Sequence, residues 1–133
     1  MRSIDLRITS GSRLITDLTS EAASFVADQA DGLLSVFVPH ATAGVALIET
    51  GAGTEPDLAD ALERLLPTKD IYRHRHGSLG HGRDHVLPAF VSPSLTIPVL
   101  GGRLALGTWQ SIVLVDPNRD NPQRTVRLSF LPG

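Results

Sequence analysis

The sequence predicts a single α+β domain over residues 1–133, in which two main helices pack on a mixed or antiparallel β-sandwich of about seven strands. Three observations support this class. Two stretches place apolar residues three or four positions apart, as on one face of a helix. The last third of the chain alternates apolar and polar residues with the period of a strand. The length is typical of one domain with its own core.

The first half of the chain is predicted to mix strands and helices. Ile4, Leu6 and Ile8 lie on one face of an alternating segment, and the nearly continuous apolar run at 33–38 is typical of a central strand. Pro56 stands in the first turn of a helical segment, where its missing N–H costs nothing. The predicted elements are strands 3–8, 13–16, 33–38 and 44–48 and helices 17–30 and 54–66.

The second half is predicted to be mostly β-structure. Gly101 and Gly102 supply a tight hairpin turn, and Val126, Leu128 and Phe130 alternate with polar neighbours. Before these strands, a long aperiodic segment holds four of the five histidines, and loops of this length inside a domain are usually functional or disordered. The predicted elements are strands 95–99, 103–110, 111–115 and 123–130, a polar loop at 117–122, and a short helical turn around 84–91 inside the aperiodic segment 68–93.

Composition excludes several classes of protein. A formal net charge of -2 and a pI near 6.2 argue against a nucleic-acid-binding protein, which usually carries a basic face. Without cysteine there is no thiolate nucleophile and no disulfide framework. The N-terminus has no signal-peptide pattern, and no apolar run approaches the roughly 20 residues that a membrane helix needs. We therefore expect a cytoplasmic protein that does not bind membranes.

Histidines are the strongest candidates for chemistry. His40 directly follows a predicted buried strand, and His74 and His85 bracket the long loop. Three neutral imidazoles from separate segments can bind a divalent metal, zinc or magnesium, or can form a cationic phosphate pocket when protonated. The alternative is five unrelated surface histidines, because no compact metal-binding motif is present. His76 and His81 are predicted to be solvated in the glycine-rich loop.

Small residues after His40 offer a second feature. Thr42 has a hydroxyl group, and Ala43 and Gly44 would let the backbone approach a ligand closely, with free N–H groups that could bind an anion. The alternative is a bend between two strands that needs small side chains for packing.

Two further groups of residues are candidates for the site. Glu49 follows an apolar strand and could be a general base or a metal ligand, although such residues are more often solvated loop acids. Thr108, Trp109 and Gln110 could contact substrate. Trp109 between them is expected to pack in the core or at a subunit interface, where its indole N–H would find a partner.

Five ordered segments resemble the motifs of the YjbQ-like family, the secondary thiamine-phosphate synthases. The first segment resembles the opening signature of the family, the next two resemble its loop histidines, and the last two resemble its closing strands. Position 41 is Ala where Thr is common in the family, and Asp116 stands where Glu is common. The segments are His40-Ala41-Thr42-Ala43-Gly44 with Glu49, Tyr72-Arg73-His74, His85, Ser94–Val99 and Gly107-Thr108-Trp109-Gln110.

The resemblance implies an α+β homotrimer with a site near the subunit boundary that contains His40, His74 and His85 as catalytic residues and metal ligands, assisted by Glu49. It implies binding of a small phosphorylated metabolite, with Thr42 and the backbone N–H groups beside it as contacts. The implied reaction joins a pyrimidine pyrophosphate to a thiazole phosphate and releases pyrophosphate. Two alternatives stay open: a metal-dependent hydrolase of a phosphorylated metabolite, and a non-catalytic trimer that binds a phosphate ligand.

Overall fold

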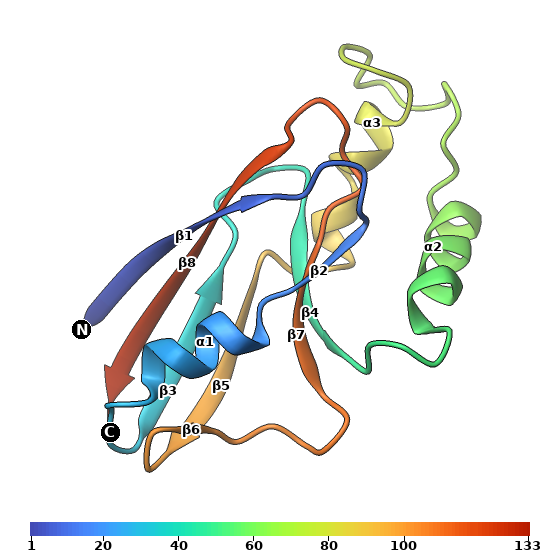
Figure 1. Cartoon of the computed structure of the whole chain (residues 1–133). Helices are drawn as coiled ribbons and strands as arrows, with labels where there is room; N and C mark the ends of the chain where they lie inside the picture. The colour runs from blue at the N-terminus through green and yellow to red at the C-terminus, as the bar shows by residue number, and fades with distance from the viewer.

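The computed structural model describes residues 1–133 and has two antiparallel sheets (Figure 1). The larger sheet has the order β1-β8-β3-β5-β6 and the smaller one β2-β7-β4. This arrangement confirms the predicted α+β class. The elements are β1 (Arg2–Thr9), β2 (Ile15–Asp17), α1 (Thr19–Val26), β3 (Gly32–Phe37), β4 (Gly44–Ile48), α2 (Thr54–Leu65), α3 (His81–Asp84), the 3-10 helix η1 (Leu87–Ala89), β5 (Ser94–Leu100), β6 (Arg103–Leu104), β7 (Ser111–Val115) and β8 (Gln123–Pro132).

Strand β8 is an interior strand of the larger sheet, paired with β1 on one side and with the central strand β3 on the other. Its alternate residues Val126, Leu128 and Phe130 are buried, as the sequence pattern predicts. The residues between them face the other way, where Arg127 lies opposite Asp5 on β1. The period of two therefore fixes which face of the sheet meets the core.

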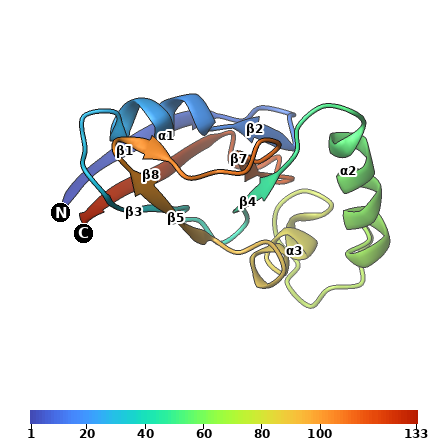
Figure 2. The same ribbon diagram turned by 90° about the horizontal axis from the view of Figure 1, so that it is seen from below.

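The main core lies between the two sheets and under α1. Ala22, Phe25 and Val26 of α1 are buried in it, and Asp17 accepts a hydrogen bond from the first amide of the helix, Thr19 N–H, at 2.8 Å. The helix ends at Val26, four residues before the predicted end, because the next residues turn and Asp28 pairs with Arg2 at 2.9 Å. Figure 2 shows α1 on one side of the larger sheet and no helix over its opposite face.

Helix α2 packs on the outer side of the smaller sheet and forms a second core. Leu62, Leu66, Leu87, Val113 and Val115 are buried together there. Because Leu87 belongs to η1, this core also supports the chain that leads away from α3. The predicted long loop is thereby anchored at both ends, after α2 and at η1.

The predicted strand 103–110 is wrong beyond its first two residues. The chain turns at Gly107, whose carbonyl accepts the Gln110 N–H at 3.1 Å, while the Gln110 side-chain oxygen accepts the Gly107 N–H at 2.9 Å. Trp109 lies on this turn with 72% of its surface exposed, so it is not a core residue. None of the helices is both long enough and apolar enough to cross a membrane.

Candidate metal centre

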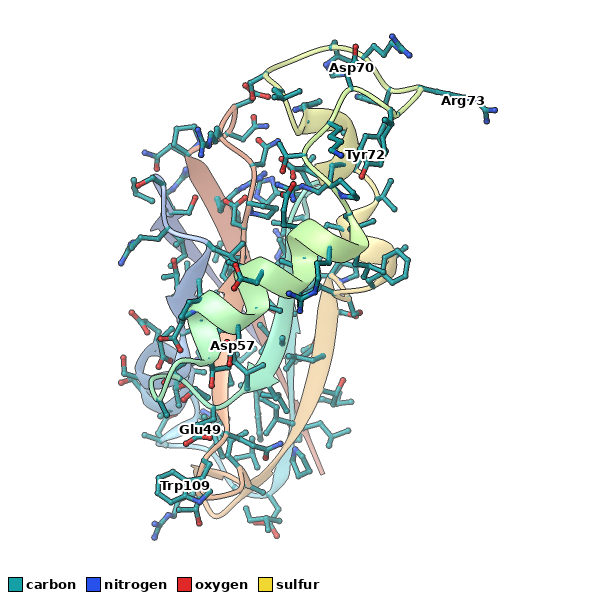
Figure 3. All side chains as sticks on the ribbon, turned by 90° about the vertical axis from the view of Figure 1, so that its right-hand side faces the viewer. Glu49, Asp57, Asp70, Tyr72, Arg73 and Trp109 are labelled. Atoms are coloured by element: carbon teal, nitrogen blue, oxygen red, sulfur yellow. The ribbon has the colours of Figure 1, made fainter.

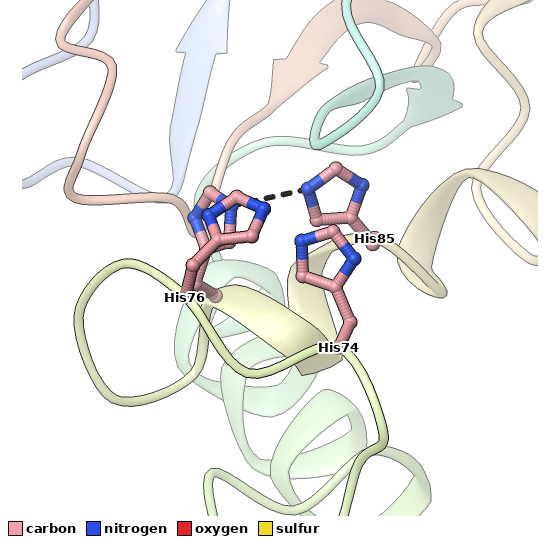
Figure 4. Close-up of side chains that lie close together, drawn as sticks. His74, His76 and His85 are labelled. Carbon is pink, nitrogen blue, oxygen red and sulfur yellow. Dashed lines mark hydrogen bonds between the residues drawn. The ribbon is translucent and has the colours of Figure 1, made fainter.

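Four histidines meet at one end of the molecule (Figure 4). His74 and His76 come from the segment before α3, His81 is the first residue of α3, and His85 follows that helix. We call these four residues the histidine cluster. Each offers a ring nitrogen, and these nitrogens lie within 4.8 Å of one another. The dashed line in Figure 4 marks the hydrogen bond between Nε2 of His85 and Nε2 of His81, at 3.1 Å.

Glycines make this convergence sterically feasible. An added Cβ at Gly82 would lie 2.5 Å from the His74 carbonyl oxygen and 2.9 Å from the Tyr72 Cβ, and one at Gly77 would lie 2.7 Å from His81 Cγ. Only glycine therefore lets the segment before α3 fold back against the helix. His81 and His85 are four residues apart along a helical turn, which places both rings on the same face.

The histidine cluster has a buried side, which we call its floor (His81 and His85), and an exposed side, which we call its rim (His74 and His76). His81 is buried, His85 is partly buried, and His74 and His76 are exposed. The prediction that His81 is solvated is wrong, because α3 turns its ring inward. A ligand would therefore enter from the side of His74 and His76.

The surroundings favour neutral imidazoles at His74 and His85. Burial and then the neighbouring histidines lower the pKa of both rings below the ordinary histidine value. Asp84 partly opposes this shift at His85. Neutral rings keep a lone pair free, which is the form that binds a metal.

Asp120 holds the buried end of the histidine cluster. One of its carboxylate oxygens lies 2.8 Å from His81 Nδ1, on the ring edge opposite the nitrogen that faces His85. The Ser78 backbone N–H donates to the same carboxylate, and this hydrogen bond is the largest cause that lowers the pKa of Asp120. An ionised carboxylate behind a metal-ligating histidine is a common arrangement in metal sites.

The arrangement has the dimensions of a site for a transition metal. In a tetrahedral zinc site with Zn–N bonds of 2.0–2.1 Å, neighbouring ligand nitrogens are about 3.3–3.4 Å apart. The 3.1 Å contact between His81 and His85 is close to this value, and the wider pairs would need a modest closure of the exposed segment. Imidazole ligands suit zinc, copper, iron and nickel, whereas magnesium prefers oxygen ligands.

A pocket of about 420 Å³ adjoins the exposed side of the histidine cluster. His74 and His76 form part of its wall together with the cations Lys69 and Arg75. Arg75 makes a loose ion pair of 3.5 Å with Asp70, and both side chains are largely exposed. The pocket wall therefore contains both possible metal ligands and positively charged side chains.

His40 lies outside the histidine cluster within one chain. Its Nε2 accepts the Thr125 backbone N–H at 2.9 Å, so the nitrogen is already used. Burial first, and then the cation Arg124, lower the pKa of His40. The predicted trio is thus realised in part: His74 and His85 meet, but their partners in the chain are His76 and His81.

The residues after His40 pack in the core or hydrogen-bond to a neighbouring side chain, so they do not form an open anion-binding site. The Thr42 hydroxyl accepts a hydrogen bond from Arg124 at 2.8 Å, and Ala43 is part of the main core. Gly44 packs so tightly on the Val91 carbonyl that a side chain there would clash. These contacts fit the alternative explanation, a strand bend that needs small residues.

Glu49 and Trp109 lie at the end of the molecule opposite Tyr72, which is next to the histidine cluster (Figure 3). Glu49 is exposed, at the end of β4 that points away from His40. Thr108 and Gln110 belong to the same distant turn as Trp109. Within one chain, the predicted site residues therefore separate into two groups at opposite ends.

Comparisons with known proteins agree on one family. The family model described as "UPF0047 protein YjbQ-like" matches residues 4–133. A UPF0047 protein of Mycobacterium tuberculosis is 63% identical over 128 residues, covering 96% of each chain. The crystal structure of a hypothetical protein from Aeropyrum pernix superposes with a TM-score of 0.89 at 30% identity over all of both chains. A YbjQ-like protein of unknown function from Sulfolobus solfataricus shares the fold, with a TM-score of 0.90 at 22% identity over 99% of this chain and 97% of that one.

Proposed function

We propose that this chain, which belongs to the UPF0047 family of YjbQ-like proteins, is a metal-dependent enzyme that acts on a small phosphorylated metabolite. One observation carries the proposal: four histidines offer ring nitrogens within 4.8 Å of one another beside a pocket. The all-imidazole ligand set favours Zn²⁺ or a similar transition metal over magnesium.

Charge supports an anionic substrate. Neutral imidazoles would leave the charge of a bound divalent ion uncompensated, and Lys69 and Arg75 add positive charge at the neighbouring pocket wall. Arg75 is partly neutralised by Asp70, so Lys69 is the stronger candidate for contact with phosphate. The pocket volume of about 420 Å³ falls within the range of metabolite sites.

Hydrolysis of a phosphorylated metabolite fits this site best. A bound zinc ion would polarise a phosphoryl oxygen and lower the pKa of a coordinated water. The residues of the chain would do the rest: Lys69 would orient the phosphate, and His81 with Asp120 would keep the floor of the centre rigid. The exposed rim at His74 and His76 would admit substrate and water.

Thiamine-phosphate synthesis is a second candidate, and one observation favours it. The same wall that carries Lys69 and Arg75 could neutralise the negative charge that develops when pyrophosphate departs. Both reactions can be assayed on one preparation, with His85→Ala as the inactive control. Product formation that survives in His85→Ala would exclude this site for that reaction, and tight phosphate binding without turnover would indicate a non-catalytic binding protein.

Metal binding is the first test of the proposal. Titration of the metal-free protein with Zn²⁺ is expected to give one ion per chain, and the His81→Ala and His85→Ala variants are expected to lose it. His40→Ala should retain the ion, because His40 lies outside the histidine cluster. Loss of zinc in His40→Ala but not in His81→Ala would replace this site with the trio predicted from the sequence.

We also propose that the protein is a homotrimer that uses the uncovered face of the larger sheet. Three large apolar residues on that face are exposed: Leu33 by 42%, Phe37 by 39% and Leu131 by 53%. Leu33 and Leu131 are register partners, so they form part of one continuous patch. Light scattering should give three times the chain mass of 14.2 kDa, whereas the mass of a single chain would contradict the proposal.

A further inference from the structure

The segment between β7 and β8 reaches the back of the histidine cluster through two residues, Asp120 and Asn118. Asp120 accepts from His81 at 2.8 Å, and the same carboxylate accepts the Ser78 backbone N–H at 3.1 and 3.3 Å. Asp120 therefore joins the ligand His81 to the loop that carries His76. The sequence pattern of residues 117–122 indicates no more than a polar loop.

Asn118 fixes the position of Asp120. Its side-chain oxygen accepts the backbone N–H groups of Asp120 and Asn121, each at 3.1 Å, and its own backbone N–H donates to Asp116 at 3.1 Å. The Asn118 side chain also donates from Nδ2 to Asp84 at 3.0 Å. With only 1% of its surface exposed, Asn118 holds this loop as a rigid support.

These contacts select one tautomer of His81. Two groups approach Nδ1: the Asp120 carboxylate at 2.8 Å, which can only accept, and the Asn118 Nδ2 at 3.1 Å, which can only donate. Both cannot be satisfied by a single Nδ1 state. The carboxylate is closer and charged, and Asn118 Nδ2 already has Asp84 as an acceptor, so the proton resides on Nδ1. The Nε2 lone pair of His81 then points into the histidine cluster.

We propose that Asp120 is the positioning residue of the metal centre: it orients the His81 ring and keeps the proton on Nδ1, so that Nε2 is free to bind the ion. This inference rests on the proposed metal-dependent function. Loss of such a partner behind a metal ligand typically weakens metal binding by about 10- to 100-fold. Asn118 acts one step further back, through Asp120.

Titration with Co²⁺ tests the inference, because its visible spectrum reports the coordination geometry as well as the affinity. Asp120→Ala is expected to bind Co²⁺ about 10- to 100-fold more weakly than the wild type with an altered spectrum. Asp120→Asn, which can still accept through its side-chain oxygen, is expected to fall between the two. The matched control is Asp28→Ala, which also removes a hydrogen-bonded carboxylate, to Arg2 and Gln29, but on another part of the surface.

Nuclear magnetic resonance of the histidine ring nitrogens gives a second readout that needs no metal. The wild type should show His81 protonated at Nδ1, and Asp120→Ala should show a mixture of tautomers. Equal Co²⁺ affinity in Asp120→Ala and the wild type would overturn the inference while leaving the metal centre intact. If the wild type binds no Co²⁺, the proposed function fails, and the tautomer of His81 alone decides whether Asp120 positions the ring.

Discussion

The buried ion pair between Asp116 and Arg124 should dominate the stability of this end of the molecule. Arg124 donates from Nε and Nη2 to the two oxygens of Asp116, each at 2.8 Å, and both side chains are 1% exposed. Asp116→Asn keeps the shape of the side chain but leaves the guanidinium charge buried without its partner. Removal of one member of such a pair costs about 3–5 kcal/mol of the free energy of unfolding. For a chain of this length, that loss lowers Tm by roughly 10–20 °C.

Strand β8 provides a matched control. Arg127 makes the same two-bond contact with Asp5, at 2.8 and 3.0 Å, but both of these side chains are nearly half exposed. Because solvent screens an exposed pair, Asp5→Asn should change Tm far less than Asp116→Asn. Thermal and urea unfolding of both variants, followed by circular dichroism, makes the comparison. A loss in Asp116→Asn no larger than that in Asp5→Asn would refute the reasoning.

Three further predictions concern the histidine cluster. Because burial and the neighbouring histidines lower the pKa values of His74 and His85, protons should compete with zinc for these two rings only below the ordinary histidine value of about 6.5. The same lowered values should make the metal-free protein easier to unfold as the pH falls below about 6.5. A decline in either property that begins well above pH 7 would contradict the expectation. Gly82→Ala should weaken zinc binding and reduce stability by about 1–3 kcal/mol, since its methyl group would push the His74 backbone away, and calorimetry checks both effects. His76→Ala should retain measurable zinc binding, because it removes an exposed ligand and leaves the buried His81 and the partly buried His85 in place. His81→Ala should not, because it removes the buried ligand. Equal losses in the two variants would argue against a buried floor and an exposed rim.

Much of the fold could be predicted because local pattern and tertiary burial agree. The alternation of Val126, Leu128 and Phe130 correctly predicts the inner face of β8, and the apolar run at 33–38 correctly predicts a central strand. The predicted strand 103–110 is wrong beyond Leu104, because the chain turns at Gly107. Periodicity alone does not reveal that a side-chain amide will close that turn.

The site was harder to predict than the fold. The sequence predicts a short helical turn only from about position 84, whereas α3 begins at His81, so the pattern does not reveal that His81 and His85 share one helical face. Gly80 before His81 is the one signal for this earlier start, and with it the four-residue spacing of His81 and His85 indicates a pair of ligands. His40 was correctly placed after a central strand, but its ring direction depends on a contact with Thr125, 85 residues further along the chain.

Asp120 and Asn118 left no signal that a single sequence could provide. Their roles depend on the packing of the segment between β7 and β8 against α3, which joins residues more than 30 positions apart. Polar residues in such a segment are ordinarily assigned to a solvated loop. Here Asn118 is buried, and Asp120 stays exposed but turns a carboxylate oxygen to His81, because a buried histidine and the buried Asp84 need hydrogen-bond partners.

Crystals soaked in Zn²⁺ and measured at the zinc absorption edge would test the central claim most directly. We predict one anomalous peak per chain, about 2.0–2.1 Å from ring nitrogens of both His81 and His85, with His74 or His76 completing the coordination. A peak bound instead through His40, or four histidines that keep their positions with no ion among them in excess zinc, would contradict the assignment.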